Sequence, residues 1–203
     1  MRVRSLPNII TMLLGLLAMA APAAAQTSDS GGTAPSSTST ASVTASGGRE
    51  YGTEDPSLQP IVAGSVAKLQ PNGLAAAPLD APPEVQNAIW AANQIIGRPY
   101  IYGGGHRSFA ARGYDCSGTV SFALHGASLL RSPLDSGSFM RWGLAGKGDW
   151  FTVYTNPGHA FAVIAGMRLD TSAAGDPSGL SGPRWRPNLR STRGFRARHP
   201  LGF

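Results

Sequence analysis

One long segment without large apolar side chains limits how much of this chain can fold. From Thr27 to Gly48 the sequence consists mostly of Ser, Thr, Gly and Ala. This composition buries too little apolar surface to offset the entropy that is lost when a chain becomes ordered. We therefore predict a flexible tether over residues 26–57, so that the folded part of the 203-residue chain follows it.

The first 25 residues have the features of an export signal. Arg2 and Arg4 precede an apolar run from Ile9 to Ala21, and the small residues Ala23–Ala25 fit a signal peptidase site. The run is too short to span about 30 Å of hydrocarbon, so we expect no retained membrane anchor. The sequence thus predicts a signal peptide over residues 1–25 and a secreted protein of the cell envelope or periplasm.

The composition excludes several classes of protein. Only 14% of the residues are charged, and much of the 42% hydrophobic fraction is Ala, which excludes a polytopic membrane protein and a long coiled coil. The single cysteine, Cys116, excludes an internal disulfide and any zinc or iron–sulfur site with several thiolates. We expect neither a metal nor a cofactor.

Residues 58–82 form a short extension before the main domain, which we place at residues 83–203. Within the extension, Val66–Leu69 is followed by the turn former Pro71-Asn72-Gly73. This pattern is equally typical of a weak hairpin and of a further linker.

Two helices are predicted at the start of the main domain. Pro83 suits a first helical turn, an apolar series at helical spacing follows it to Ile96, and Gly97 suits the termination. A second helical pattern follows Cys116 and continues to Ala127. Cys116 should therefore lie near a helix amino terminus.

After Asp149 the pattern changes to short strands. Residues 150–155, 160–166 and 194–198 are rich in β-branched or aromatic side chains and are separated by turn formers. Helices followed by strands predict an α+β domain with helices packed on a mainly antiparallel sheet.

An unpaired cysteine in an exported protein is a liability unless it is buried or has a chemical use. The backbone N–H groups at a helix amino terminus stabilise a thiolate and bind an oxyanion, as a cysteine hydrolase requires. The alternative is that Cys116 is a small buried hydrophobic residue.

A nucleophilic cysteine also needs a base, and the chain has four histidines. His125 lies nine residues, or roughly 13 Å, along the same helix, so it is too far from the thiol. His199 is expected to be solvated, and His106 in the glycine-rich loop is a weaker candidate. His159 begins a strand and is the favoured base, and Asp170 on the next strand is its candidate orienting group.

Several motifs in order resemble the NlpC-type cell-wall cysteine peptidases. They are Pro99-Tyr100-Ile101-Tyr102-Gly103-Gly104, Asp115-Cys116-Ser117-Gly118, Pro133-Leu134-Asp135-Ser136, Gly148-Asp149 and Gly158-His159-Ala160-Phe161-Ala162-Val163. The resemblance covers about residues 84–172 and implies a compact papain-like domain. It also implies cleavage of peptidoglycan stem peptides, commonly between D-glutamate and a diamino acid.

By this resemblance, Cys116 is the nucleophile and His159 the base. Tyr100 would place its phenol near the oxyanion or the substrate. Asp115, with Ser117 beside the nucleophile and Ser136 in the same pocket, would bind the stem peptide and its free amine. Two features depart from the family: Asp170 replaces the usual polar residue, commonly His, and the loop from Gly105 to Tyr114 is longer.

Other interpretations remain beside this one. The same Cys and His could serve an amidase or acyltransferase, or the domain could be a non-catalytic wall-binding module. Six arginines between Arg184 and Arg198 predict a solvated basic strand and loop, or a surface for an anionic envelope polymer. We expect no nucleic-acid partner, because an exported protein rarely meets one.

Overall fold

The computed structural model describes residues 56–203. The predicted signal peptide and nearly all of the predicted tether lie outside these residues. The described part belongs to one compact unit of the chain. None of its helices has both the length and the apolar character needed to cross a bilayer.

A six-stranded sheet forms the centre of the fold, in the order β4-β9-β5-β6-β7-β8. Every pairing in it is antiparallel, as predicted. The strands are β4 (Leu144–Ala145), β5 (Phe151–Asn156), β6 (His159–Ile164), β7 (Met167–Asp170), β8 (Arg184–Arg186) and β9 (Arg196–His199).

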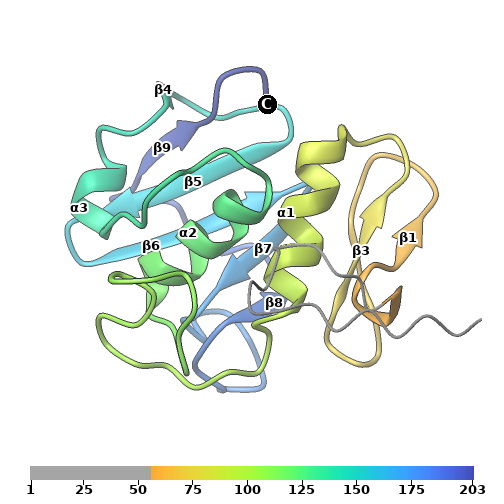
Figure 1. Ribbon diagram of the computed structural model, residues 1–203, viewed down its shortest axis with the longest axis horizontal. Helices are drawn as coiled ribbons and strands as arrows, with labels where there is room; N and C mark the ends of the chain where they lie inside the picture. The colour runs from red at the N-terminus through yellow and green to blue at the C-terminus, as the bar shows by residue number, and fades with distance from the viewer. Residues whose placement is uncertain (1–55) are drawn as a thin grey trace, which may run out of the picture. The chain divides into compact units, whose positions relative to one another are not determined.

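Two helices, α1 (Pro83–Asn93) and α2 (Cys116–Gly126), cover one face of this sheet (Figure 1). Successive side chains of a strand point to opposite faces of the sheet, so one face is buried against the two helices. Val153, Ala162 and Leu169 lie on that face and are fully buried in the same core cluster. The opposite face of the central strands carries His159 and Asp170. The protein is therefore an α+β domain, and a short third helix, α3 (Ser136–Phe139), precedes β4.

Helix α1 ends earlier than the sequence pattern predicts, at Asn93 instead of the residue before Gly97. The next N–H groups bond carbonyls three residues back, as from Ile95 to Ala92, so the chain tightens into turns. Gly97 then takes a left-handed conformation with φ +83°, and its N–H donates to the Pro183 carbonyl. Contacts with the β8 side of the sheet thus override the local helical pattern.

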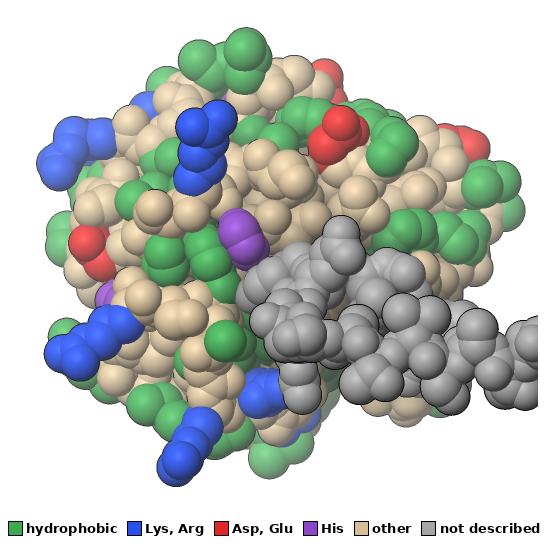
Figure 2. Space-filling view, in the orientation of Figure 1, with side chains coloured by type: hydrophobic (Ala, Val, Ile, Leu, Met, Phe, Trp, Pro, Cys, Tyr) green, Lys and Arg blue, Asp and Glu red, His purple; other side chains and the backbone are tan. Residues whose placement is uncertain are grey.

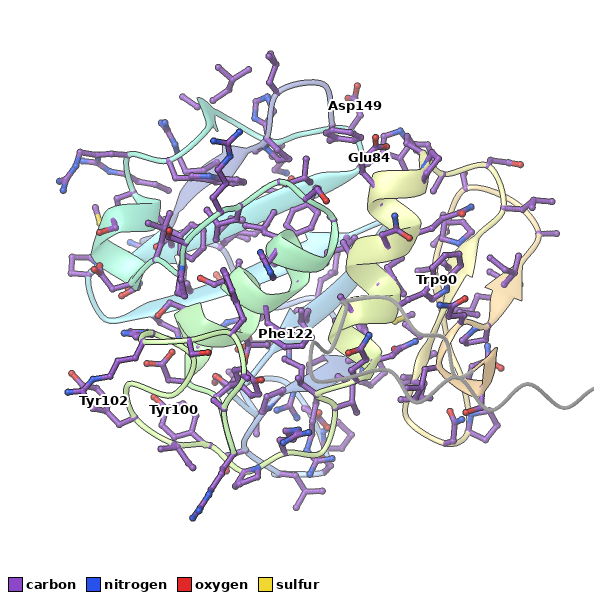
Figure 3. The ribbon with its side chains drawn as sticks, viewed as in Figure 1. Glu84, Trp90, Tyr100, Tyr102, Phe122 and Asp149 are labelled. Carbon is purple, nitrogen blue, oxygen red and sulfur yellow. The ribbon has the colours of Figure 1, made fainter. Side chains whose placement is uncertain are left out.

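The extension packs against the same core. It comprises η1 (Pro56–Leu58), β1 (Ile61–Val62), β2 (Lys68–Leu69) and β3 (Ala75–Pro78). Strands β2 and β3 pair as an antiparallel hairpin, and β1 joins β3 in parallel. Trp90 projects from α1 toward this small sheet (Figure 3) and donates to the Pro60 carbonyl at 3.4 Å.

Part of the arginine-rich tail differs from the predicted solvated basic segment, although Arg193 and Arg196 are exposed as predicted. Arg186 is 1% exposed, and its guanidinium pairs with Asp176, which lowers the pKa of that carboxyl to about 2. Arg198 donates to two backbone carbonyls before β4. The tail supplies β8 and β9, so neighbouring segments offer acceptors to its guanidinium groups. On the face in Figure 2, the described Lys and Arg side chains are scattered and form no single patch.

Candidate active site

The amino terminus of α2 presents the single thiol. Asp115 is the N-cap: its Oδ1 accepts from the Gly118 N–H at 2.8 Å, and its backbone carbonyl accepts from the Thr119 N–H at 3.0 Å. Cys116 is the first helical residue and is 8% exposed. The N–H groups of Cys116 and Ser117 lie in the first turn, where the helix itself provides no acceptor.

The glycine-rich loop is held tightly against this helix end. The chain at Tyr100 runs beside Tyr114 in a parallel bridge, and the Asp115 N–H donates to the Gly104 carbonyl at 3.2 Å. A Cβ on Gly118 would overlap that same carbonyl oxygen. Glycine is needed here because two backbones approach each other closely.

The strands bring His159 and Asp170 together, as the sequence predicts. His159 begins β6 and Asp170 ends β7, and these strands are adjacent and antiparallel. His159 Nε2 lies 2.9 Å from Asp170 Oδ1. Because Asp170 occupies Nε2, the nitrogen left for Cys116 is Nδ1.

The charge state of His159 follows from these two neighbours. Burial lowers its pKa, but hydrogen bonds with Asp170 and Cys116, together with their negative charges, outweigh burial and raise the pKa to about 9. The imidazole is therefore protonated at neutral pH and lies between two acidic groups.

Asp170 is fully buried and held by several donors. The Ser172 N–H donates to Oδ1 at 2.8 Å, and Arg190 Nη1 donates to Oδ2 at 3.1 Å. Burial opposes ionisation, but the bonds from His159, Ser172 and Arg190 keep the pKa of Asp170 below its usual value. The carboxylate is therefore charged over the physiological pH range.

Tyr100 lies close enough to the thiol to sense its charge. Burial, and then the negative charges of Cys116 and Asp115, raise the pKa of the Tyr100 phenol, which is therefore protonated and able to donate. The neighbouring Tyr102 is 92% exposed. Both tyrosines lie on the loop between α1 and α2 (Figure 3).

Asp115 is engaged within the protein. Besides Gly118, its carboxylate accepts from the Gly103 N–H at 3.0 Å and the Ser117 hydroxyl at 3.2 Å. His106 Nε2 lies 3.0 Å from Asp115 Oδ2 and 2.9 Å from Ser117 Oγ. A substrate amine that reached Asp115 would therefore have to displace or join His106.

Ser136 contacts the turn before β6. Its hydroxyl donates to the Pro157 carbonyl at 3.1 Å, and its carbonyl accepts from the Thr155 hydroxyl. Its neighbour Asp135 is the N-cap of α3, and its pKa is lowered mainly by the Ser138 N–H and, more weakly, by the charge of His106. Ser136 itself bonds the turn that leads to His159.

The two remaining histidines have structural contacts. His125 stacks on Phe109 with ring centroids 3.7 Å apart, and its Nδ1 lies 2.9 Å from the Leu130 carbonyl. His199 is half-buried on β9, with Nδ1 3.1 Å from the Gly146 carbonyl at an exposed position, and so is only partly the solvated residue predicted. Strand pairing in the tail explains that difference.

Sequence reasoning missed the arginines around Asp170. Arg168 is fully buried on β7, 3.7 Å from Asp170 Oδ2, and its guanidinium has no hydrogen-bond partner among the described residues. Arg190 lies between β8 and β9 and bonds the same oxygen. The only sequence signal for arginines beside the Asp170 carboxylate is the high arginine content of the tail.

A cavity of about 330 Å³ lies along the outer face of the central strands, and Arg190 forms part of its wall. Its floor includes Tyr154, Phe161 and Val163, and Lys147 and Asp149 are also among its lining residues. Cys116 does not line it.

No protein-family model matches the chain, and no curated protein has a significantly similar sequence.

Proposed function

We propose that this protein is an exported cysteine hydrolase of the NlpC type that cleaves peptide bonds in peptidoglycan stem peptides. The observation that carries the proposal is the arrangement of Cys116, His159 and Asp170. A thiol at a helix amino terminus interacts with an imidazole that a buried carboxylate holds from the other side. This is the arrangement that nucleophilic catalysis by a thiolate requires.

The first half of the reaction forms an acyl-enzyme. The Cys116 thiolate attacks the carbonyl carbon of the scissile amide, and the carbonyl oxygen becomes an oxyanion. When the C–N bond breaks, the protonated His159 gives its proton to the leaving amine. The products of this step are a free amine, a thioester on Cys116 and a neutral imidazole.

The second half regenerates the enzyme. Neutral His159 takes a proton from a water molecule as that water attacks the thioester carbonyl. The C–S bond then breaks, the carboxylic acid product leaves, and the thiolate and imidazolium are restored. Asp170 keeps the imidazole in one orientation and stabilises its charge through both steps.

The first turn of α2 offers donors for the oxyanion. The N–H groups of Cys116 and Ser117 lack acceptors within the helix, whereas the Gly118 N–H already donates to Asp115 Oδ1. The Tyr100 phenol is a further donor, because it stays protonated beside the thiol. The papain-like assignment rests on the same layout: the helix with the thiol packs on the antiparallel sheet that carries the base and acid.

Peptidoglycan is proposed as the substrate because of the order of motifs and the export signal. The decisive test incubates the full chain, and its Cys116→Ala variant, with intact sacculi and with a synthetic L-Ala-γ-D-Glu-diaminopimelate peptide. Mass spectrometry should detect cleavage at the D-glutamyl bond with the wild-type protein only. Release of a different amide or an acylated amine would favour an amidase or acyltransferase with the same thiol.

A thiol-reactivity assay separates catalysis from binding. Iodoacetamide should modify Cys116 of the folded wild type quickly at mildly acidic pH, because an activated thiolate reacts faster than a free thiol. Modification no faster than that of a free thiol, with no product from either substrate, would indicate a wall-binding module without turnover.

Acetylation of the peptide's amine tests the pocket at Asp115. If the carboxylate binds that ammonium in place of His106, acetylation should lower cleavage by roughly 10- to 100-fold, as expected for a charge-assisted bond. Equal cleavage of both peptides would leave Asp115 as a cap of α2 only.

A further inference from the structure

We propose that Arg190, on the loop between β8 and β9, is a positioning residue that orients Asp170 toward His159 and limits the negative charge that the imidazole experiences. The inference rests on the proposed function, because it assigns Arg190 a part in the same site. It makes the arginine-rich tail part of the catalytic apparatus.

The first observation is that the two oxygens of the Asp170 carboxylate have different partners. Oδ1 faces His159 Nε2 at 2.9 Å, and Oδ2 accepts from Arg190 Nη1 at 3.1 Å. Holding both oxygens fixes the rotation of the carboxylate about its Cβ–Cγ bond. The lone pairs of Oδ1 therefore remain directed at the imidazole.

The second observation is that Arg190 is itself held, although it lies on a loop. Its guanidinium carbon lies 5.3 Å from the centroid of the Phe161 ring and 5.4 Å from that of Phe195. Phe195 also contacts the His159 ring edge-on, with centroids 6.2 Å apart. Cation–π contacts of this kind fix a guanidinium at little desolvation cost, so the loop and the catalytic strand form one packed unit.

The other arginines near Asp170 do not hold its carboxylate in the same way. Arg168 Nε is 3.7 Å from Oδ2, beyond hydrogen-bonding distance. Arg186 donates to the backbone carbonyl of Asp170 at 3.2 Å and pairs with Asp176. Among the described residues, Arg190 is thus the arginine that hydrogen-bonds the carboxylate.

Charged groups face this pair from every neighbouring element. Asp170 on β7 and Cys116 on α2 both raise the pKa of His159 and so favour the imidazolium. Positive charge comes from Arg168 on β7, Arg186 on β8 and Arg190 on the loop. The carboxylate of Asp176 offsets the charge of Arg186. Arg184 pairs with Asp170 across the strands, and its side chain donates to the Ser181 carbonyl.

This balance has a catalytic consequence. A carboxylate without a counter-ion would hold the imidazolium proton too strongly for transfer to the leaving amine. Arg190 offsets part of that charge without touching the imidazole. An ionised Asp can thus take a place where the resemblance leads us to expect another polar residue, commonly His.

The test compares Arg190→Gln and Arg190→Lys with Arg193→Gln, a control on an exposed position of the same loop. NMR titration of the His159 ring and the pH dependence of Cys116 alkylation are measured on the full chain. We expect Arg190→Gln to raise both midpoints by about one pH unit, because a nearby cation is lost. Arg190→Lys should shift them less, and Arg193→Gln should not shift them.

Unchanged midpoints in folded Arg190→Gln would overturn the proposal. If that variant does not fold, the wild type still decides: the Arg190 side-chain resonances should titrate with the same midpoint as His159, and no such titration would refute the coupling. These readouts need no substrate. A protein that shows the coupling but cleaves nothing would refute the proposed hydrolase and leave the role of Arg190 intact.

Discussion

At the scale of single residues, the protein holds an ion pair between His159 and the buried Asp170. His159 contacts two acidic groups while it is mostly buried, and its pKa of about 9 reflects their combined effect over that of burial. Two functional consequences follow. The imidazolium is available as an acid at neutral pH, and its charge also stabilises the fold.

The first prediction concerns stability against pH. A group whose folded pKa is raised from 6.5 to about 9 contributes stability that is fully present below pH 6.5 and is lost as the pH rises through about 9. Urea unfolding at intervals from pH 6 to 10 should show this loss in the wild type. His159→Gln should lack it, and equal slopes for both proteins would contradict the assignment.

The second prediction concerns the identity of the base. His159→Ala should abolish hydrolysis, while His125→Ala and His199→Ala should retain most of it, because Nδ1 of each of these rings bonds a backbone carbonyl, that of Leu130 and that of Gly146. Initial rates on stem peptide give the comparison. Loss of activity in His106→Ala with an active His159→Ala protein would transfer the role to the glycine-rich loop.

The third prediction concerns the orienting carboxylate. Asp170→Asn should lower turnover by about one to three orders of magnitude, because a neutral amide stabilises the imidazolium less and can select the wrong tautomer. The alkaline limb of the pH–rate profile should also move to lower pH. An unchanged rate and limb would mean that another polar group orients His159.

At the scale of elements, the contact between α1 and α2 positions the thiol against the sheet. A Cβ on Gly126 would overlap the Ala91 side chain, so the absence of a side chain at Gly126 sets the distance between the helices. Gly126→Ala should therefore cost about 1–3 kcal/mol in unfolding free energy, as overpacked cores do. The double variant with Ala91→Gly should recover much of the loss, and additive effects would argue against this contact.

The sequence predicted secondary-structure elements better than the tertiary contacts between them. Helical spacing identified both helices, and the Gly166 turn correctly placed Asp170 on the strand beside His159. The end of α1 and the burial of Arg186 were predicted wrongly, because each depends on tertiary partners outside the local segment. Local propensity carries no information on such partners, so the arginine cluster was also missed.

At the scale of the whole domain, one buried amide joins segments that are far apart in the chain. Asn93 is 3% exposed, and its Oδ1 accepts from the Ala75 N–H at 3.0 Å and from Trp185 Nε1 at 2.8 Å. Its Nδ2 donates to the carbonyls of Leu58 and Ala75 at 2.8 and 3.0 Å. The last residue of α1 thus ties η1 and β3 of the extension to β8 of the main sheet.

The fifth prediction follows from this junction. Asn93→Ala should lower the unfolding free energy by about 3–5 kcal/mol, because it leaves several buried donors and acceptors without partners and opens a small cavity. Trp185→Phe, which removes one of these bonds and keeps most of the ring, should cost about 1–2 kcal/mol. Urea denaturation of the full chain measures both. If Asn93→Ala costs no more than Trp185→Phe, the extension is not held through this amide, and its apolar contacts with α1 must account for its attachment.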